Sequence, residues 1–248
     1  MKRLICCLTL AVVATGIAAP KPLSQMTPEE KAAHMKLVQE KTGGFLDIES
    51  KGRLVVVNAQ KRISADAVRK SATELGNVLK LTVDYAEGEL AMYRVPDGAT
   101  GALVVGDSAD LPMSVVAAEK TWGLLNVAPL ATDDAAKLDK RFRMEFIRVA
   151  TFAFGQSLSQ FTGSPLQTIK DADGLDSVIT DGYTYDTVTT MLKNLGALGM
   201  TQKRKTSYRR ACMEGWAPAP TNDVQKKVWN EVLAMPDKPI KIQKNKSR

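Results

Sequence analysis

The sequence is nearly without histidine, since His34 is the only one among its 248 residues. A zinc peptidase needs two or three imidazole ligands, each about 2.0–2.1 Å from the metal, so this chain cannot build a histidine-ligated zinc site. A Ser-His-Asp triad could use only His34, which we expect to face solvent among lysines of an N-terminal helix. We therefore expect no bound metal and no cofactor.

Cysteine is scarce too, and two of the three cysteines lie near the N-terminus. A basic tripeptide opens the chain, and the apolar run 4–18, which contains Cys6 and Cys7, ends in small residues before Pro20. This is the pattern of a secretory signal peptide, and the run is shorter than the roughly 20 apolar residues of a membrane span. We expect cleavage near Ala18 and a secreted or periplasmic protein.

After this cleavage Cys212 is the only cysteine left. The mature chain then cannot form an intramolecular disulfide, even in an oxidising compartment. A lone thiol can pair between chains or act as a nucleophile, but a buried, unreactive cysteine is the more common state and the one we expect here.

Acidic residues are few at the C-terminal end. Residues 203–248 contain twelve Lys and Arg against four Asp and Glu, whereas residues 19–202 carry a net charge of −3. A basic segment attracts anionic partners such as sulfated or sialylated glycans, lipid head groups or nucleic acid. We expect an anionic glycan or a glycoprotein rather than a specific nucleic acid, with a solvated tail as the alternative.

Local patterns predict strands in the first half of the chain and helices in the second. A helix is expected at 28–41, strands at 53–58, 78–85, 101–106 and 112–117, and further helices at 64–76, 133–160, 186–195 and from 221 to before 236. A strand, helix and strand in succession imply parallel neighbouring strands.

We therefore predict a mixed α/β (α+β) fold in a single domain. Its mostly parallel sheet lies in the N-terminal half, a long central helix packs on it, and the C-terminal part is helical. The expected segments are a signal peptide at 1–18, an N-terminal helix and connector at 19–52, the α/β body at 53–202, and a basic C-terminal arm, packed on the body, at 203–248.

The predicted long helix contains the segment Arg-Phe-Arg-Met-Glu-Phe-Ile-Arg-Val-Ala-Thr-Phe-Ala-Phe-Gly at 141–155. It resembles the active-site helix of archaemetzincin-type metallopeptidases, whose pattern is Arg-x-x-Lys-Glu-x-x-His-Glu-x-x-His-x-Phe-Gly. In this register Arg148 and Phe152 stand at the first two ligand positions and Val149 at the catalytic glutamate. The resemblance implies a metzincin-like body whose zinc site is replaced by packing. An amphipathic core helix with chance identities is the alternative.

Carboxylates are the remaining chemical possibility, because Asp171, Asp173, Asp176 and Asp181 follow this helix within one short stretch. Two aspartates about 3 Å apart can share a proton and activate water, which permits an aspartic-type peptidase using Asp173 with Asp176 or Asp181. The stretch also resembles a partial calcium loop, but its Gly comes too early and a closing Glu is missing. Helix caps and turns are the structural alternative.

The segment 209–222 is the most distinctive one, with Trp216 between proline-rich turns. It resembles segments of secreted proteins of Verrucomicrobia-type bacteria. Trp216 could stack on a sugar ring while Arg209, Arg210 or Glu214 bind sugar hydroxyls, or Trp216 could anchor the C-terminal arm.

Together these features predict a secreted, metal-independent, metzincin-like pseudo-peptidase that binds an extracellular or envelope macromolecule, such as a glycoprotein, through its basic C-terminal face. The alternative is a secreted carboxylate-dependent peptidase that degrades glycoproteins such as mucin.

Overall fold

The computed structural model describes residues 21–88, 98–155, 158–159 and 161–235. The expected signal peptide therefore lies outside the described residues. The chain divides into two compact units, residues 47–206 and residues 1–46 with 207–248. The fold is mixed α/β with a mostly parallel sheet, as predicted. The segment boundaries at 52 and 202, and packing of the C-terminal arm on the body, stay predictions.

A five-stranded sheet forms the centre of the unit 47–206. Its strands, in spatial order, are β3 (Val83–Glu87), β2 (Leu54–Asn58), β4 (Gly101–Gly106), β6 (Trp122–Asn126) and β5 (Ser114–Val116). Neighbouring strands are parallel except for the edge strand β5, which is antiparallel to β6. The parallel pairing of β2 and β3 confirms the predicted crossover.

Strand β6 was not predicted, because Trp-Gly-Leu-Leu-Asn contains no β-branched residue. Gly123 within it has a packing role: a Cβ at this position would lie 2.8 Å from Val149 Cγ1 and 3.0 Å from Ala153 Cβ. The helix that carries Val149 and Ala153 can approach the sheet this closely only because residue 123 has no side chain.

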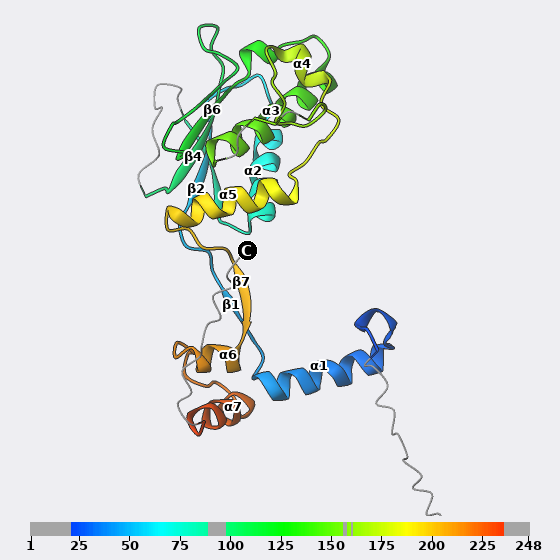
Figure 1. Ribbon diagram of the computed structural model, residues 1–248, viewed down its shortest axis with the longest axis vertical. Coiled ribbons are helices and arrows are strands. Elements are labelled where there is room, and N and C mark those ends of the chain that lie inside the picture. The colour runs from blue at the N-terminus through cyan, green and yellow to red at the C-terminus, as the bar shows by residue number, and fades with distance from the viewer. Residues whose placement is uncertain (1–20, 89–97, 156–157, 160, 236–248) are drawn as a thin grey trace, which may run out of the picture. The chain divides into compact units, whose positions relative to one another are not determined.

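Helices α2 (Ala65–Leu79) and α3 (Ala135–Ala153) pack on one face of this sheet (Figure 1). Each starts where a side chain caps free backbone N–H groups: Ser64 accepts a hydrogen bond from Ala67 N, and Asp134 from Ala136 N and Lys137 N. Alternate residues of the central strands, including Leu54, Val56, Leu103 and Leu125, bury their side chains in the core against these helices.

Two predicted helix ends were wrong. The helix α2 does not stop at Gly76 but continues to Leu79 and ends at Lys80, which adopts a left-handed φ of 54°. The following strand consequently begins at Val83 rather than at residue 78. The helix α3 ends at Ala153 instead of residue 160, and Gly155 with a φ of 118° turns the chain away.

The remaining elements of this unit are short. They are the 3₁₀ helix η2 (Ala128–Leu130), α4 (Ala172–Asp176) and α5 (Tyr185–Ala197). Strands β1 (Phe45–Ile48) and β7 (Arg204–Ser207), neither of them predicted, have residues in both units and pair in a separate two-stranded sheet.

The smaller unit contains the 3₁₀ helix η1 (Leu23–Gln25) and helices α1 (Pro28–Thr42), α6 (Tyr208–Met213) and α7 (Asp223–Leu233). Thr27 and Glu30 form the expected capping box at the start of α1. Tyr208 is the buried centre of this unit: its ring contacts the ring of Trp229 and its hydroxyl donates to Pro218 O at 2.9 Å. Across the described ranges, no helix has both the length and the apolar character to span a membrane.

Candidate functional site

Three charged side chains of α3 are almost completely buried. Arg141, Glu145 and Arg148 are 4%, 0% and 5% exposed. They follow one another at intervals of four and three residues, so they lie along one face of the helix. Burying a charge costs several kcal/mol unless it is paired and hydrogen-bonded, so the partners of these groups decide what this face can do.

The first pair joins two residues of the helix itself. Arg148 Nε donates to Glu145 Oε2 at 2.9 Å. The Nη1 group of Arg148 also donates to two backbone carbonyls, those of Pro165 and of Gln167, the latter at 2.8 Å. The guanidinium thus ties the loop around residue 165 to α3, using the planar arrangement of donors that lysine lacks.

Glu145 is incompletely compensated. Among the described residues its Oε1 atom accepts no hydrogen bond. Burial raises the pKa of Glu145, against the positive charge of Arg148 and the nearby Ser114 side chain, which both lower it. Arg148 is therefore the group on which the buried carboxylate depends for its charge.

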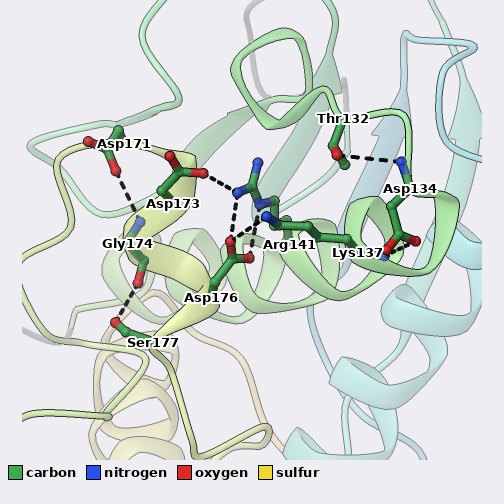
Figure 2. Close-up of polar contacts among 9 residues, drawn as sticks. All are labelled: Thr132, Asp134, Lys137, Arg141, Asp171, Asp173, Gly174, Asp176 and Ser177. Atoms are coloured by element: carbon green, nitrogen blue, oxygen red, sulfur yellow. Dashed lines mark hydrogen bonds and ion pairs between the residues drawn. The ribbon is translucent and has the colours of Figure 1, made fainter.

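The second cluster surrounds Arg141 (Figure 2). Its guanidinium binds Asp176 through two hydrogen bonds, Nε to Oδ1 at 3.0 Å and Nη2 to Oδ2 at 2.7 Å. The same Nη2 also binds Asp173, and Lys137 Nζ lies 3.0 Å from Asp176 Oδ2. The hydrogen bond from Arg141, helped by Lys137, lowers the pKa of Asp176 to about 2.

The structure brings Asp173 and Asp176 together, but around an arginine. Two carboxyls that share a proton hydrogen-bond to each other, whereas Asp173 and Asp176 both bind the guanidinium of Arg141. Asp181 lies apart and binds Arg143 Nη1 at 3.0 Å. Asp171 caps α4 by accepting from Gly174 N at 3.0 Å. These contacts favour the structural alternative for the four aspartates over a catalytic pair.

The residues at the ligand positions of the metallopeptidase pattern do not fit a zinc ion. The Arg148 guanidinium carbon lies 5.3 Å from the centre of the Phe152 ring, so the two positions contact each other as cation and aromatic ring. A guanidinium has only N–H donors and no lone pair for a metal. Among the residues that the structure describes, no three His, Cys, Asp or Glu side chains are grouped to hold a metal ion.

The predicted binding residues of the smaller unit form one cluster and one separate pair. Glu214 accepts from Arg210 Nε at 2.8 Å through Oε1, and from Trp216 Nε1 at 2.7 Å through Oε2. Arg209 instead binds Glu231 of α7 at 2.6 Å and 2.9 Å. Trp216 is 42% exposed, so its indole is held by Glu214 while part of the ring remains accessible.

The sequence did not reveal Tyr208, which is 0% exposed and is the aromatic anchor of this unit. A signal was present, because Ser207 is a typical helix N-cap and accepts a hydrogen bond from Arg210 N. Cys212, on the same helix, is free and partly buried, and burial raises the pKa of its thiol. A raised pKa keeps the thiol protonated and weakly nucleophilic.

Comparison with known proteins gives structural neighbours alone. No protein-family model matches the chain, and no curated protein sequence does. The chain is similar to the crystal structure of an archaemetzincin from Methanopyrus kandleri, with 13% identity, a TM-score of 0.48, and coverage of 58% of this chain and 96% of that one.

Two other solved structures are similar to a lesser degree. An archaemetzincin from Archaeoglobus fulgidus, complexed with malonate, shares 10% identity with a TM-score of 0.43, over 56% of this chain and 99% of that one. A zinc-dependent peptidase from Methanocorpusculum labreanum shares 11% identity with a TM-score of 0.42, over 56% of this chain and all of that one.

Replacing Arg148 by methionine should lower the free energy of unfolding by about 3–5 kcal/mol, because Glu145 would remain buried without its partner. The double variant Glu145→Leu/Arg148→Met should regain part of this loss, since it removes the buried charge. Urea denaturation followed by circular dichroism measures both. Arg62→Met, which breaks an ion pair with Asp107 at the surface of the same unit, is the control and should change stability by less than about 1 kcal/mol. If Arg148→Met and the control substitution lower the free energy of unfolding equally, the buried pair does not have a stabilising role.

The Arg141 cluster should make stability depend on pH in the acidic range. The folded pKa of Asp176 is about 2, below the ordinary value of about 3.9, so its contribution is complete above about pH 4 and is lost as the pH falls through about 2. The stability difference between wild type and Asp176→Asn should therefore shrink over this interval in urea titrations. Asp173→Asn, which removes the more exposed of the two carboxylates at Arg141, is the matched control variant. A difference that is constant from pH 7 to pH 2 would refute this assignment.

Proposed function

We propose that the protein is a secreted, metal-independent, metzincin-like pseudo-peptidase that binds an extracellular or envelope glycoprotein. One observation carries the first half of this proposal: the position of the first metal ligand holds Arg148, and its guanidinium is committed to Glu145 and to two backbone carbonyls. A group with this many buried bonds cannot be released for catalysis without a large loss of stability.

The binding half of the proposal rests on the cluster of Arg210, Glu214 and Trp216. An aromatic ring that is both fixed and accessible can stack on a sugar ring at little cost in conformational entropy. Glu214 fixes the indole of Trp216 through Nε1, and Arg210 fixes Glu214 in turn. The accessible part of the Trp216 ring is the face that would contact the sugar.

The basic residues of the C-terminal segment support long-range attraction of an anionic glycan rather than direct contact of each arginine with it. Arg209 and Arg210 are each bound to a carboxylate, so neither guanidinium is free to clamp an anion. The net excess of basic residues over 203–248 remains, and its field would attract sialylated or sulfated glycans before the contacts form.

The binding of both Asp173 and Asp176 to Arg141 disfavours the carboxylate-dependent peptidase as a second candidate. The signal-peptide pattern at residues 1–18 supports a partner outside the cytoplasm. The mature protein, beginning near Ala19, is accordingly the form in which binding should be measured.

Binding to a mucin glycoprotein, measured by surface plasmon resonance, should weaken about tenfold in Trp216→Ala, which is roughly the 1.4 kcal/mol of a truncated aromatic anchor. Leu233→Ala is the matched control, because Leu233 is also exposed and belongs to the same unit. Affinity should also fall severalfold when salt is raised from about 50 mM to about 500 mM, because screening removes the long-range attraction. If neither Trp216→Ala nor the higher salt concentration changes the affinity for mucin, the Trp216 cluster is not the binding surface.

Metal removal should change nothing. We expect EDTA to leave mucin binding unaltered, and the protein to cleave neither mucin nor an unbiased peptide library between acidic and neutral pH. Mass spectrometry of the digests provides the measurement, with Asp173→Asn and Asp176→Asn as paired controls. Cleavage that resists EDTA but disappears in both variants would replace the pseudo-peptidase by a carboxylate-dependent peptidase, and cleavage abolished by EDTA would show a metal-dependent enzyme.

A further inference from the structure

A cavity of about 360 Å³ lies beside α3, and its lining residues do not include the Trp216 cluster of the smaller unit. Ile147 and Thr151 of α3 line it together with side chains from residues 159–166 and 180–187. Its volume falls within the roughly 300–1,000 Å³ of small-molecule sites. The cavity is therefore large enough for a small ligand, and its lining residues decide which kind of ligand it suits.

Half of the residues that line the cavity carry a hydroxyl group. Six of the lining residues are serine or threonine: Thr151, Ser159, Ser164, Thr180, Thr184 and Thr187. Asp186 is the single charged residue among those that line the cavity. A surface of neutral hydroxyls with one carboxylate suits a neutral ligand rich in hydroxyl groups, since the carboxylate accepts hydrogen bonds from such a ligand and repels an anion.

Two of these hydroxyls keep a donor for a ligand. The Oγ atoms of Ser159 and Ser164 each accept a hydrogen bond from the backbone, from Phe161 N at 3.1 Å and from Leu166 N at 3.2 Å. A hydroxyl has one donor and two acceptor sites, so these backbone bonds orient both serines without using their O–H groups.

An aromatic ring stands beside the hydroxyls. Phe161 lines the cavity and is nevertheless 80% exposed. An exposed phenyl ring costs free energy in water but offers a flat apolar face to the C–H groups of a sugar ring. Stacking on such a ring, combined with hydrogen bonds at its edge, is how proteins hold molecules that are apolar on one face and polar around the rim.

The cavity walls are connected to one another by hydrogen bonds. Gly163 O accepts from Ile179 N at 3.0 Å and from Thr180 N at 3.2 Å, which joins the two loops. Gln167 Oε1 accepts from Gly163 N at 2.6 Å. Arg148 holds the carbonyls of Pro165 and Gln167 from the side of α3. Walls fixed before binding reduce the entropy that a ligand must overcome.

We propose that this cavity binds one neutral sugar residue, stacked on Phe161, with its hydroxyls bonded to Ser159, Ser164 and Asp186. This proposal rests on the proposed function, because it also takes the partner to be a glycan, but it assigns a site separate from the Trp216 cluster. The shared chemistry is that of a neutral pyranose, either as a free monosaccharide or as a residue of a glycan chain. Arg148 then stabilises a wall of a sugar site where the metallopeptidase pattern has a metal ligand.

The test uses the mature protein with four free sugars, glucose, galactose, mannose and N-acetylglucosamine, and with a desialylated mucin. Saturation-transfer NMR and titration calorimetry should detect binding of at least one free sugar at millimolar concentration. Phe161→Ala and Asp186→Asn should each weaken it about tenfold or more. Ile179→Ala, at a similarly exposed side chain on the neighbouring loop, should leave it unchanged.

The outcomes separate this site from the proposed function. Loss of free-sugar binding in Phe161→Ala and Asp186→Asn but not in Ile179→Ala supports the cavity, and the same pattern with desialylated mucin shows that it takes residues of a glycan. If none of the free sugars binds, or if Trp216→Ala alone weakens binding, the cavity is not a sugar site. That result would not contradict glycoprotein binding by the Trp216 cluster. Conversely, if free sugars bind but mucin does not, the glycoprotein proposal is wrong and the cavity proposal is supported.

Discussion

The buried ion pair between Glu145 and Arg148 is the constraint on which this region of the protein depends. A carboxylate that is fully enclosed on α3 is stable in its charged form only beside a fixed positive charge. The same guanidinium reaches across to the carbonyls of Pro165 and Gln167. One side chain therefore compensates the charge inside the helix and positions the loop that follows it, and the wall of the cavity is a consequence of this arrangement.

Arginines of the same helix also determine what the neighbouring aspartates can do. Arg141 binds Asp173 and Asp176, and Arg143 lies between Asp181 and Glu74, 3.0 Å from each. Among these carboxylates, Asp176 is a weak base, because the hydrogen bond from Arg141 stabilises its charged form and lowers its pKa. The acidic stretch after α3 consequently fixes α4 and its flanking loop to the long helix. Function is better sought in the exposed aromatic groups, Trp216 in one unit and Phe161 in the other.

Much of the fold followed from local rules. Thr27, Ser64 and Asp134 each stand where a helix begins, and their side chains cap those helices. Runs rich in valine and leucine became the central strands. The failures share a cause: β6 contains Gly123 because a helix lies against it, and α2 passes through Gly76 because Leu81 O lies 3.2 Å from where a Cβ would be. In both, close packing that leaves no room for a Cβ outweighed the local preference of glycine.

By itself the amino-acid sequence determined which chemistry was impossible and where helices start, because a single histidine and the order of capping residues are properties of the chain alone. It also contained the four aspartates and the cluster around Trp216 as candidates. Only the tertiary structure decided their roles, since Arg141 meets Asp176 across 35 positions and Arg148 meets Gln167 across 19. Whether a charged side chain is a ligand, a base or a structural tie depends on its partner and its burial, and both are set by segments that lie far away in the sequence.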